Sequence, residues 1–170
     1  MPVRNVMFKV TAGATPGQII YPDNTTGSAE IYTAREDVYT TEDDYRDYAV
    51  RKPQNGSAYS YERWLQVWWG DAGDTAIGNV RFYFTGALPT GWAMRIGVNE
   101  AYKTPGNTPD DTVTPYTTTS ITAGSSMALA AHLSGGIYKS DYIVLQQVVP
   151  STTPSTGSAT LSLVLLWDEV

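Results

Sequence analysis

The segment 59–69 divides into two alternating sets of side chains, one of which is mostly aromatic and aliphatic. One set is Tyr59, Tyr61, Arg63, Leu65, Val67 and Trp69, and the residues between them are Ser60, Glu62, Trp64, Gln66 and Trp68. Because successive side chains of a β-strand point to opposite faces of the sheet, a period of two predicts a strand here. Leu65 and Val67 mark the first set as the face that packs against the core.

Further segments carry strand patterns separated by Gly and Pro. The clearest are 77–84, 92–98, 141–149 and 159–167, and weaker ones are 6–12, 30–33 and 117–122. The almost continuously apolar 141–149 predicts a central strand covered on both faces. The Gly- and Asp-rich loop 70–75 predicts a hairpin between its two flanking strands. Together the pattern predicts an all-β fold, an antiparallel β-sandwich of immunoglobulin-like or jelly-roll-like type.

Helical signals are confined to two short stretches. The acids that follow Thr41 favour one short helix over 41–48, and the Ala, Leu and Met content of 125–133 favours another. We therefore expect at most one or two short helices. The whole chain, 1–170, is expected to form a single domain, in which 1–55 is an N-terminal extension or docking segment.

Composition excludes several kinds of site. The 170 residues include no Cys, one His, 11 Lys+Arg and 17 Asp+Glu, for a formal net charge of −6. Without Cys the chain lacks the thiolates of zinc, iron–sulfur and redox motifs, and a net negative charge disfavours nucleic acid as a partner. We expect no cofactor.

Hydropathy predicts neither export nor membrane insertion. The longest apolar run, 163–166 with Trp167, is far shorter than the roughly 20 residues of a transmembrane helix. The first residues also lack the apolar core of a secretory signal. The expectation is therefore synthesis in a cytoplasm, without contact with a membrane.

Residues that could catalyse a reaction lack recognisable partner residues in the sequence. His132 lies among Ala and Leu residues, with no nucleophile or orienting acid identified, and a structural or solvated role is favoured. A pair of carboxylates drawn from Glu62, Asp168 and Glu169 would suffice for glycoside hydrolysis. Solvation of these acids is the simpler interpretation, so we expect no enzyme and no catalytic residue.

An acidic stretch is the first candidate for an interaction. Between positions 30 and 47 seven acids stand against two arginines, and the candidate contact residues are Glu42, Asp43, Asp44 and Asp47. Such a stretch suits a basic partner or calcium, but it lacks EF-hand spacing. A solvated face is favoured over a metal site.

Two tryptophans are the second candidate. Trp64 and Trp68 share the strand face opposite to Leu65 and Val67. If exposed, they form a stacking surface for a sugar or an anchor for a protein. Because free monomers rarely expose large apolar patches, burial in the fold or in an oligomer interface is favoured.

A recurring order of strands and turns is found at 77–83, at 86–92, at Gly97-Val98 with Tyr102 and Pro105, at 140–146 and at the terminal 167–170. In this order the C-terminal two thirds of the chain, from about Trp64, resembles a group of small virion-associated proteins of tailed bacteriophages. The resemblance carries no catalytic or binding residues with it.

The resemblance implies a bacteriophage structural protein that acts by binding other proteins. Capsid decoration is the preferred location and the tail is the alternative, so the partners would be a major capsid or tail protein and further copies of this chain. Localisation would be the virion, after synthesis in the bacterial host cytoplasm. A carbohydrate-binding module on a tail or fibre, with Trp64 and Trp68 as stacking platforms, is the second hypothesis. A carboxylate-dependent glycoside hydrolase is the third.

Overall fold

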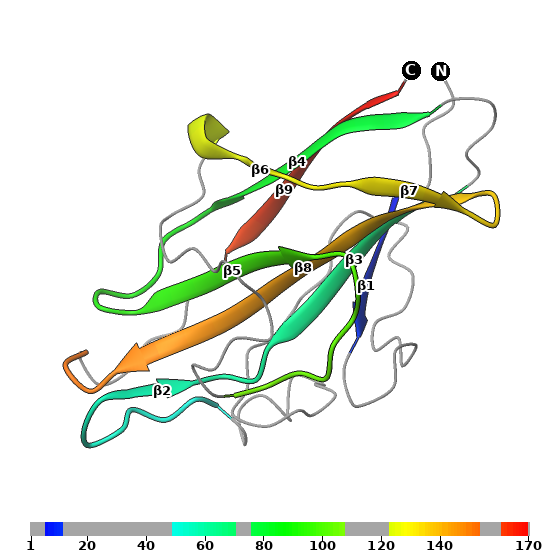
Figure 1. The fold of residues 1–170 in the computed structure, drawn as a ribbon. Helices are drawn as coiled ribbons and strands as arrows, with labels where there is room; N and C mark the ends of the chain where they lie inside the picture. Colours follow the sequence, from blue (N-terminus) through cyan, green and yellow to red (C-terminus); the bar gives the residue numbers. More distant parts are fainter. Residues whose placement is uncertain (1–5, 12–48, 71–75, 108–122, 154–160, 170) are drawn as a thin grey trace.

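The computed structural model describes residues 6–11, 49–70, 76–107, 123–153 and 161–169. These residues form nine strands in two antiparallel sheets (Figure 1). The larger sheet contains β1 (Val6–Thr11), β2 (Ser57–Tyr59), β3 (Arg63–Trp69), β5 (Ala93–Asn99), β7 (Ala131–Ser134) and β8 (Ile137–Pro150). The smaller sheet contains β4 (Ile77–Thr85), β6 (Met127–Ala128) and β9 (Ser162–Glu169). The predicted all-β, sandwich-like fold is confirmed.

Strand β8 is the centre of the larger sheet, as its apolar sequence predicts. Along one edge it pairs with β3 and then β2, and along the other it pairs with β5 and then β7. Residues 143–149 of β8 are all buried. A strand with partners on both edges and cover on both faces buries its side chains, and burying polar groups costs free energy unless they are hydrogen-bonded, which explains its apolar composition.

The core lies between the two sheets. The larger sheet contributes buried side chains from β3, β5 and β8, and the smaller sheet contributes Val80 and Phe82 of β4. At one end of the sandwich Trp69 of β3 meets Trp167 of β9 edge to face, with ring centroids 6.2 Å apart. The predicted core face of the segment 59–69 is confirmed, since Leu65, Val67 and Trp69 all belong to this core.

The segment 127–134 passes from one sheet to the other, as Figure 1 shows in yellow. Its first part, β6, pairs with β4 of the smaller sheet, and its second part, β7, pairs with β8 of the larger sheet. Between them the buried Leu129 donates its backbone N–H to the carbonyl of Val80 at 2.9 Å. The segment therefore joins the two sheets along one side of the sandwich.

The helix expected over 125–133 is therefore wrong. In the described residues the helical structure is one turn of 3₁₀ helix, Ala123–Ser125, and the following residues are extended. Helix propensities amount to a few tenths of a kcal/mol per residue, so they are overridden when two sheet edges offer backbone hydrogen bonds to the same segment.

The hairpin expected around residues 70–75 is also wrong. Strands β3 and β4 lie in different sheets, because both edges of β3 are already taken by β1 and β8. The partners of β4 are β6 and β9. The other expected elements, the helix 41–48 and the strands 30–33 and 117–122, lie outside the described residues.

Candidate interaction surface

Trp64 lies inside the molecule. Its side chain has no exposed surface, and its ring meets Tyr102 and Tyr142 edge to face at centroid distances of 5.3 and 5.7 Å. Burial also raises the pKa of the Tyr142 hydroxyl above its usual value. Because Trp64 is covered, the two tryptophans cannot form the shared stacking platform considered from the sequence.

The buried carboxylate of Glu62 belongs to the same region. Its Oε2 atom accepts hydrogen bonds from Trp64 Nε1 and from the backbone N–H of Gly106, both at 3.2 Å. The backbone N–H of Glu62 in turn donates to the carbonyl of Gly106 at 2.9 Å. These contacts attach the segment around Gly106 to the start of β3, which is a structural role for this acid.

A second set of buried polar groups lies where β2 and β3 meet β8. The side-chain amide of Gln146 donates to the carbonyl of Ser60 at 3.1 Å and accepts from Arg95 Nη1 at 2.8 Å. The hydroxyl of Ser60 accepts from the backbone N–H of Gln147 at 2.9 Å. Here three residues, 60–62, lie opposite two residues of β8, so these side chains satisfy backbone groups that a regular ladder would pair.

The three acids considered for hydrolysis are not gathered at one site. Glu62 precedes β3, whereas Asp168 follows Trp167, which packs on the last residue of β3. Strand β3 has seven residues, and at about 3.3 Å per residue its ends are roughly 20 Å apart. Glycosidases need their two carboxyl groups within about 10 Å. Glu62 therefore forms no such pair with Asp168 or with its neighbour Glu169.

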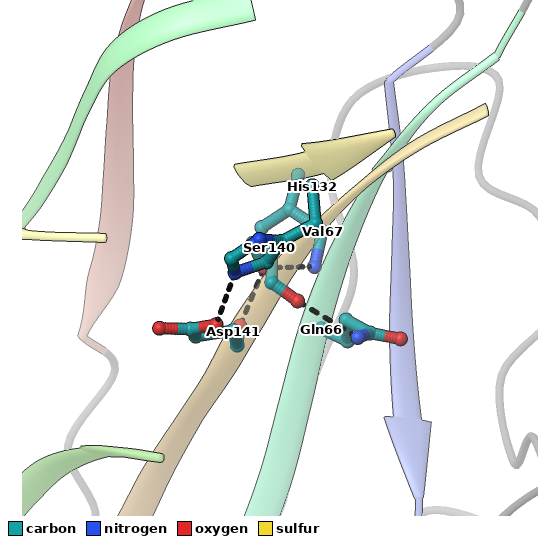
Figure 2. Close-up of polar contacts among 5 residues, drawn as sticks. All are labelled: Gln66, Val67, His132, Ser140 and Asp141. Carbon is teal, nitrogen blue, oxygen red and sulfur yellow. Dashed lines mark hydrogen bonds and ion pairs between the residues drawn. The ribbon is translucent and has the colours of Figure 1, made fainter. Parts of the chain in front are cut away.

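Figure 2 shows polar contacts around Ser140, where the pairing of β3 with β8 shifts register and forms a bulge. The backbone N–H of Val67 donates to Ser140 Oγ at 2.9 Å, and Ser140 Oγ donates to the carbonyl of Asp141 at 2.6 Å. Gln66 Nε2 donates to the carbonyl of Ser140 at 2.7 Å. The pairing register shifts here, and the serine hydroxyl takes the place of a ladder acceptor.

His132 lies beside this bulge, with Nε2 3.0 Å from Asp141 Oδ1. Ser, His and Asp are the residue types of a hydrolytic triad, and the sequence did not reveal that Asp141 is the partner of His132. The arrangement nevertheless differs from a triad, because the buried hydroxyl of Ser140 is engaged by backbone groups of Val67 and Asp141. The His132 side chain itself is 56% exposed.

Trp68 has a different environment from Trp64, although the two share a strand face. It is partly exposed, and its ring centre lies 3.7 Å from Lys9 Nζ and 4.1 Å from Lys139 Nζ. The indole Nε1 donates to Gln66 Oε1 at 2.7 Å, which fixes the direction of the ring. We call Lys9, Gln66, Trp68 and Lys139 the Trp68 cluster.

The strand order explains how the Trp68 cluster forms. Strands β1 and β8 flank β3 on opposite edges, so Lys9 and Lys139 approach the indole from opposite sides. Each ammonium group is attracted by the negative face of the ring, by about 0.5–1 kcal/mol at an exposed site. Sequence analysis found Trp68 but missed both lysines, because only the pairing register shows that they are its neighbours.

The remaining predicted contact residues, Glu42, Asp43, Asp44 and Asp47, lie outside the described residues. Within the described part, no three His, Asp or Glu side chains are placed to hold a metal ion. None of the helical structure described is long and apolar enough to cross a membrane.

Comparison with known proteins adds no relative. No family model, curated protein or solved structure matches this chain. The resemblance to phage virion proteins consequently stays a prediction, and the contacts of the described residues are the structural basis for assigning a function.

Proposed function

We propose that this chain is a structural subunit of a tailed-bacteriophage particle, attached to the capsid surface as a decoration protein and acting by protein–protein binding. The location comes from the resemblance of residues 77–170 to virion-associated proteins. The mode of action comes from the surface of the fold.

The Trp68 cluster is the main structural support for a binding function. A partly exposed tryptophan held in a fixed direction is suited to anchor a partner, because it offers a large contact area at a small cost in side-chain entropy. Apolar side chains add to this surface elsewhere: Leu133 is 61% exposed on β7 and Leu166 is 47% exposed on β9. Tryptophan is enriched at protein interfaces. Covering an exposed leucine with a partner removes apolar surface from water, which stabilises the complex.

The polar groups inside the fold support the same mode of action. Glu62, Ser60, Ser140 and Gln146 direct their side chains to backbone groups at the irregular points of the larger sheet. Their hydrogen bonds fix the register of the strands. The fold is therefore a rigid support for the residues on its surface.

A carbohydrate-binding function is the weaker candidate. It requires an exposed aromatic face against which a sugar ring stacks. Trp64 is buried, and the ring of Trp68 has ammonium groups on either side. A sugar would have to displace at least one of these lysines before it could stack.

The proposal is tested by quantitative mass spectrometry of purified, nuclease-treated particles of the phage that encodes the chain. We expect many copies per particle, in a fixed ratio to the major capsid protein. The matched control is the same preparation from a phage in which the gene is deleted. Finding the chain only in the soluble lysate, with particles free of it, would overturn the proposal.

A further inference from the structure

The outer face of the smaller sheet exposes a leucine of β9, the strand that lies alongside β4 in Figure 1. Leu163, Leu165 and Trp167 of β9 pack against the core. Because successive side chains of a strand point to opposite faces, Val164 and Leu166 lie on the outer face. Val164 is partly exposed, and Leu166 is 47% exposed. The centre of this face is therefore apolar and accessible.

Opposite charges flank Leu166 on the same face. Arg81 of β4 is its cross-strand neighbour, and Asp168 follows it by two positions along β9. Both charged side chains are exposed. At ordinary sheet spacings their Cβ atoms lie about 5 and 7 Å from that of Leu166, in directions nearly perpendicular to each other. The face thus has a positive and a negative group at similar distances from one apolar side chain.

The carboxylate of Asp168 is held in place by a residue with an unusual backbone conformation. Asn79 has a φ of 51°, which is uncommon for a residue other than glycine, and it lies in the register shift between Gly78 and Arg81. Its side-chain amide donates to Asp168 Oδ2 at 2.6 Å. Strained backbone of this kind is concentrated at functional sites. Here it orients an exposed carboxylate beside Leu166.

We propose that this surface, the Leu166 face, formed by Arg81, Val164, Leu166 and Asp168, binds the same face of a second copy about a two-fold axis. An axis that runs between the two copies, diagonal to the strands and close to Leu166, packs this leucine against its own copy. The same rotation exchanges the positions of Arg81 and Asp168. Each arginine then meets Asp168 of the partner subunit, so two identical ion pairs flank one pair of leucines.

Charge complementarity is the reason for choosing a second copy as the occupant. In a two-fold contact every residue that meets a second residue is met by it in return, so the patch must be complementary to itself. A patch of one sign would repel its own copy, whereas Arg81 and Asp168 supply one charge of each sign. Their similar distances from Leu166 allow both ion pairs to form together, which fixes the orientation of the two copies.

The proposed interface is small, because β6 adds only two residues to the nine of β4 and the eight of β9. Interfaces that bury less than about 1,200 Å² in total are typical of weak association. We therefore expect a dissociation constant in the micromolar range or weaker for the free chain. Such a contact is sufficient where many copies are held side by side, since the contacts then act together.

The inference goes beyond the proposed function and does not depend on it. Trp68 alternates with Val67 and Trp69, which belong to the core, so the Trp68 cluster lies on the outer face of the larger sheet. The Leu166 face is on the other sheet of the sandwich. Pairing of two copies through the Leu166 face consequently leaves the Trp68 cluster of each copy uncovered for another partner.

The first experiment is sedimentation velocity of the full-length chain over a wide range of concentrations. We expect a reversible equilibrium between monomer and dimer. Arg81→Glu and Asp168→Arg should each weaken dimerisation at least tenfold, because each places like charges together at both ion pairs. The two changes combined in one chain should restore dimerisation, since the charges exchange places and stay opposite. The matched control is Arg51→Glu, the same change at an exposed arginine before β2, which should leave dimerisation unaltered.

A mixture of the two single variants gives an independent result. Arg81→Glu and Asp168→Arg should each be monomeric alone, and together they should form a mixed dimer in which both contacts join opposite charges. Circular dichroism establishes that each variant is folded. If either reversal unfolds the chain, Arg81→Gln and Asp168→Asn are the milder replacements, and each should weaken dimerisation as well.

The second experiment locates the axis by cross-linking. The chain has no Cys, so a single introduced cysteine has no competitor. Leu166→Cys lies at the proposed axis and should give a covalent dimer with a short bifunctional maleimide. The matched control is Leu133→Cys on β7 of the larger sheet, where the native leucine is 61% exposed. It should cross-link at least tenfold more slowly, although it is the more accessible position.

Several results would overturn the inference. They are a wild-type chain that stays monomeric at every concentration, an equal loss of dimer in the Arg51 control, a combined variant that does not recover, and equal cross-linking rates at positions 133 and 166. A chain that is monomeric in solution but abundant in particles would refute this inference and leave the proposed function standing. A chain that dimerises through the Leu166 face but is absent from particles would refute only the virion location.

Discussion

Trp64 and Trp68 show how far one residue's role depends on its neighbours in space. Alternation along the strand places both on the same face, and their contacts agree with this, since Trp64 bonds to Glu62 and Trp68 bonds to Gln66, two residues of the same alternating set. Their depth differs because Trp64 lies opposite Val144 under Tyr102, whereas Trp68 lies opposite Lys139. A periodic sequence pattern specifies a face, but the side chains that cover the face come from distant segments, so their presence could not be predicted.

The first prediction concerns this difference in depth. Trp64→Ala should lower the free energy of unfolding by about 3–5 kcal/mol, because it leaves a cavity beside two tyrosine rings and removes a hydrogen bond from the buried Glu62. Trp68→Ala should cost about 1–2 kcal/mol, since it removes two cation–π contacts at a partly exposed site. Urea denaturation of both variants gives the comparison. Equal losses would contradict the assigned burial of Trp64.

At the scale of the elements, the sequence predicts strands far better than it predicts their partners. The segments 77–84 and 92–98 agree with β4 and β5 to within a residue or two, and 141–149 falls within β8. The predicted hairpin 59–84 and the helix 125–133 both fail, because pairing between segments distant in sequence decides the outcome. Local propensity favours a conformation without specifying which sheet edge a segment will join.

The second prediction concerns the bulge at Ser140. Ser140→Ala removes the acceptor of the Val67 N–H inside the larger sheet, and a buried donor without a partner costs about 1–3 kcal/mol. We expect a loss of this size in the free energy of unfolding. Hydrogen exchange should also become faster at the Val67 amide.

His132→Ala is the matched control for the Ser140 variant, since it alters the same bulge from the exposed side. Its contact with Asp141 is made from the exposed side, with 56% of the His132 side chain accessible to solvent, so the free energy of unfolding should change by less than about 1 kcal/mol. A larger loss in the His132 variant than in the Ser140 variant would show that the histidine, rather than the serine, holds the bulge.

At the scale of the whole molecule, charge is distributed unevenly between the described fold and the acidic stretch. Composition identified the acidic side of this distribution, since seven acids within 30–47 are evident in the sequence. The basic side could not be found in the same way, because Lys9 and Lys139 are 130 positions apart in the numbering and meet only through the pairing of β1, β3 and β8. The acidic stretch was therefore predictable from the sequence, whereas the position of both lysines beside Trp68 required the pairing register.

The last prediction concerns attachment of the chain to a particle. Replacing Glu42, Asp43, Asp44 and Asp47 by Gln or Asn should weaken co-sedimentation with particles that lack the wild-type protein, while the free energy of unfolding changes by less than about 1 kcal/mol. Exposed charges act over about 8–10 Å at physiological ionic strength, so the wild-type protein should detach as salt rises and the neutralised variant should respond less. Trp68→Ala serves as the comparison, because loss of a central aromatic anchor reduces binding by about 2 kcal/mol or more with little dependence on salt. If the neutralised protein binds as tightly as the wild type at every salt concentration, the acidic stretch does not determine attachment, and a matching loss in the Trp68 variant would assign that role to the aromatic contact.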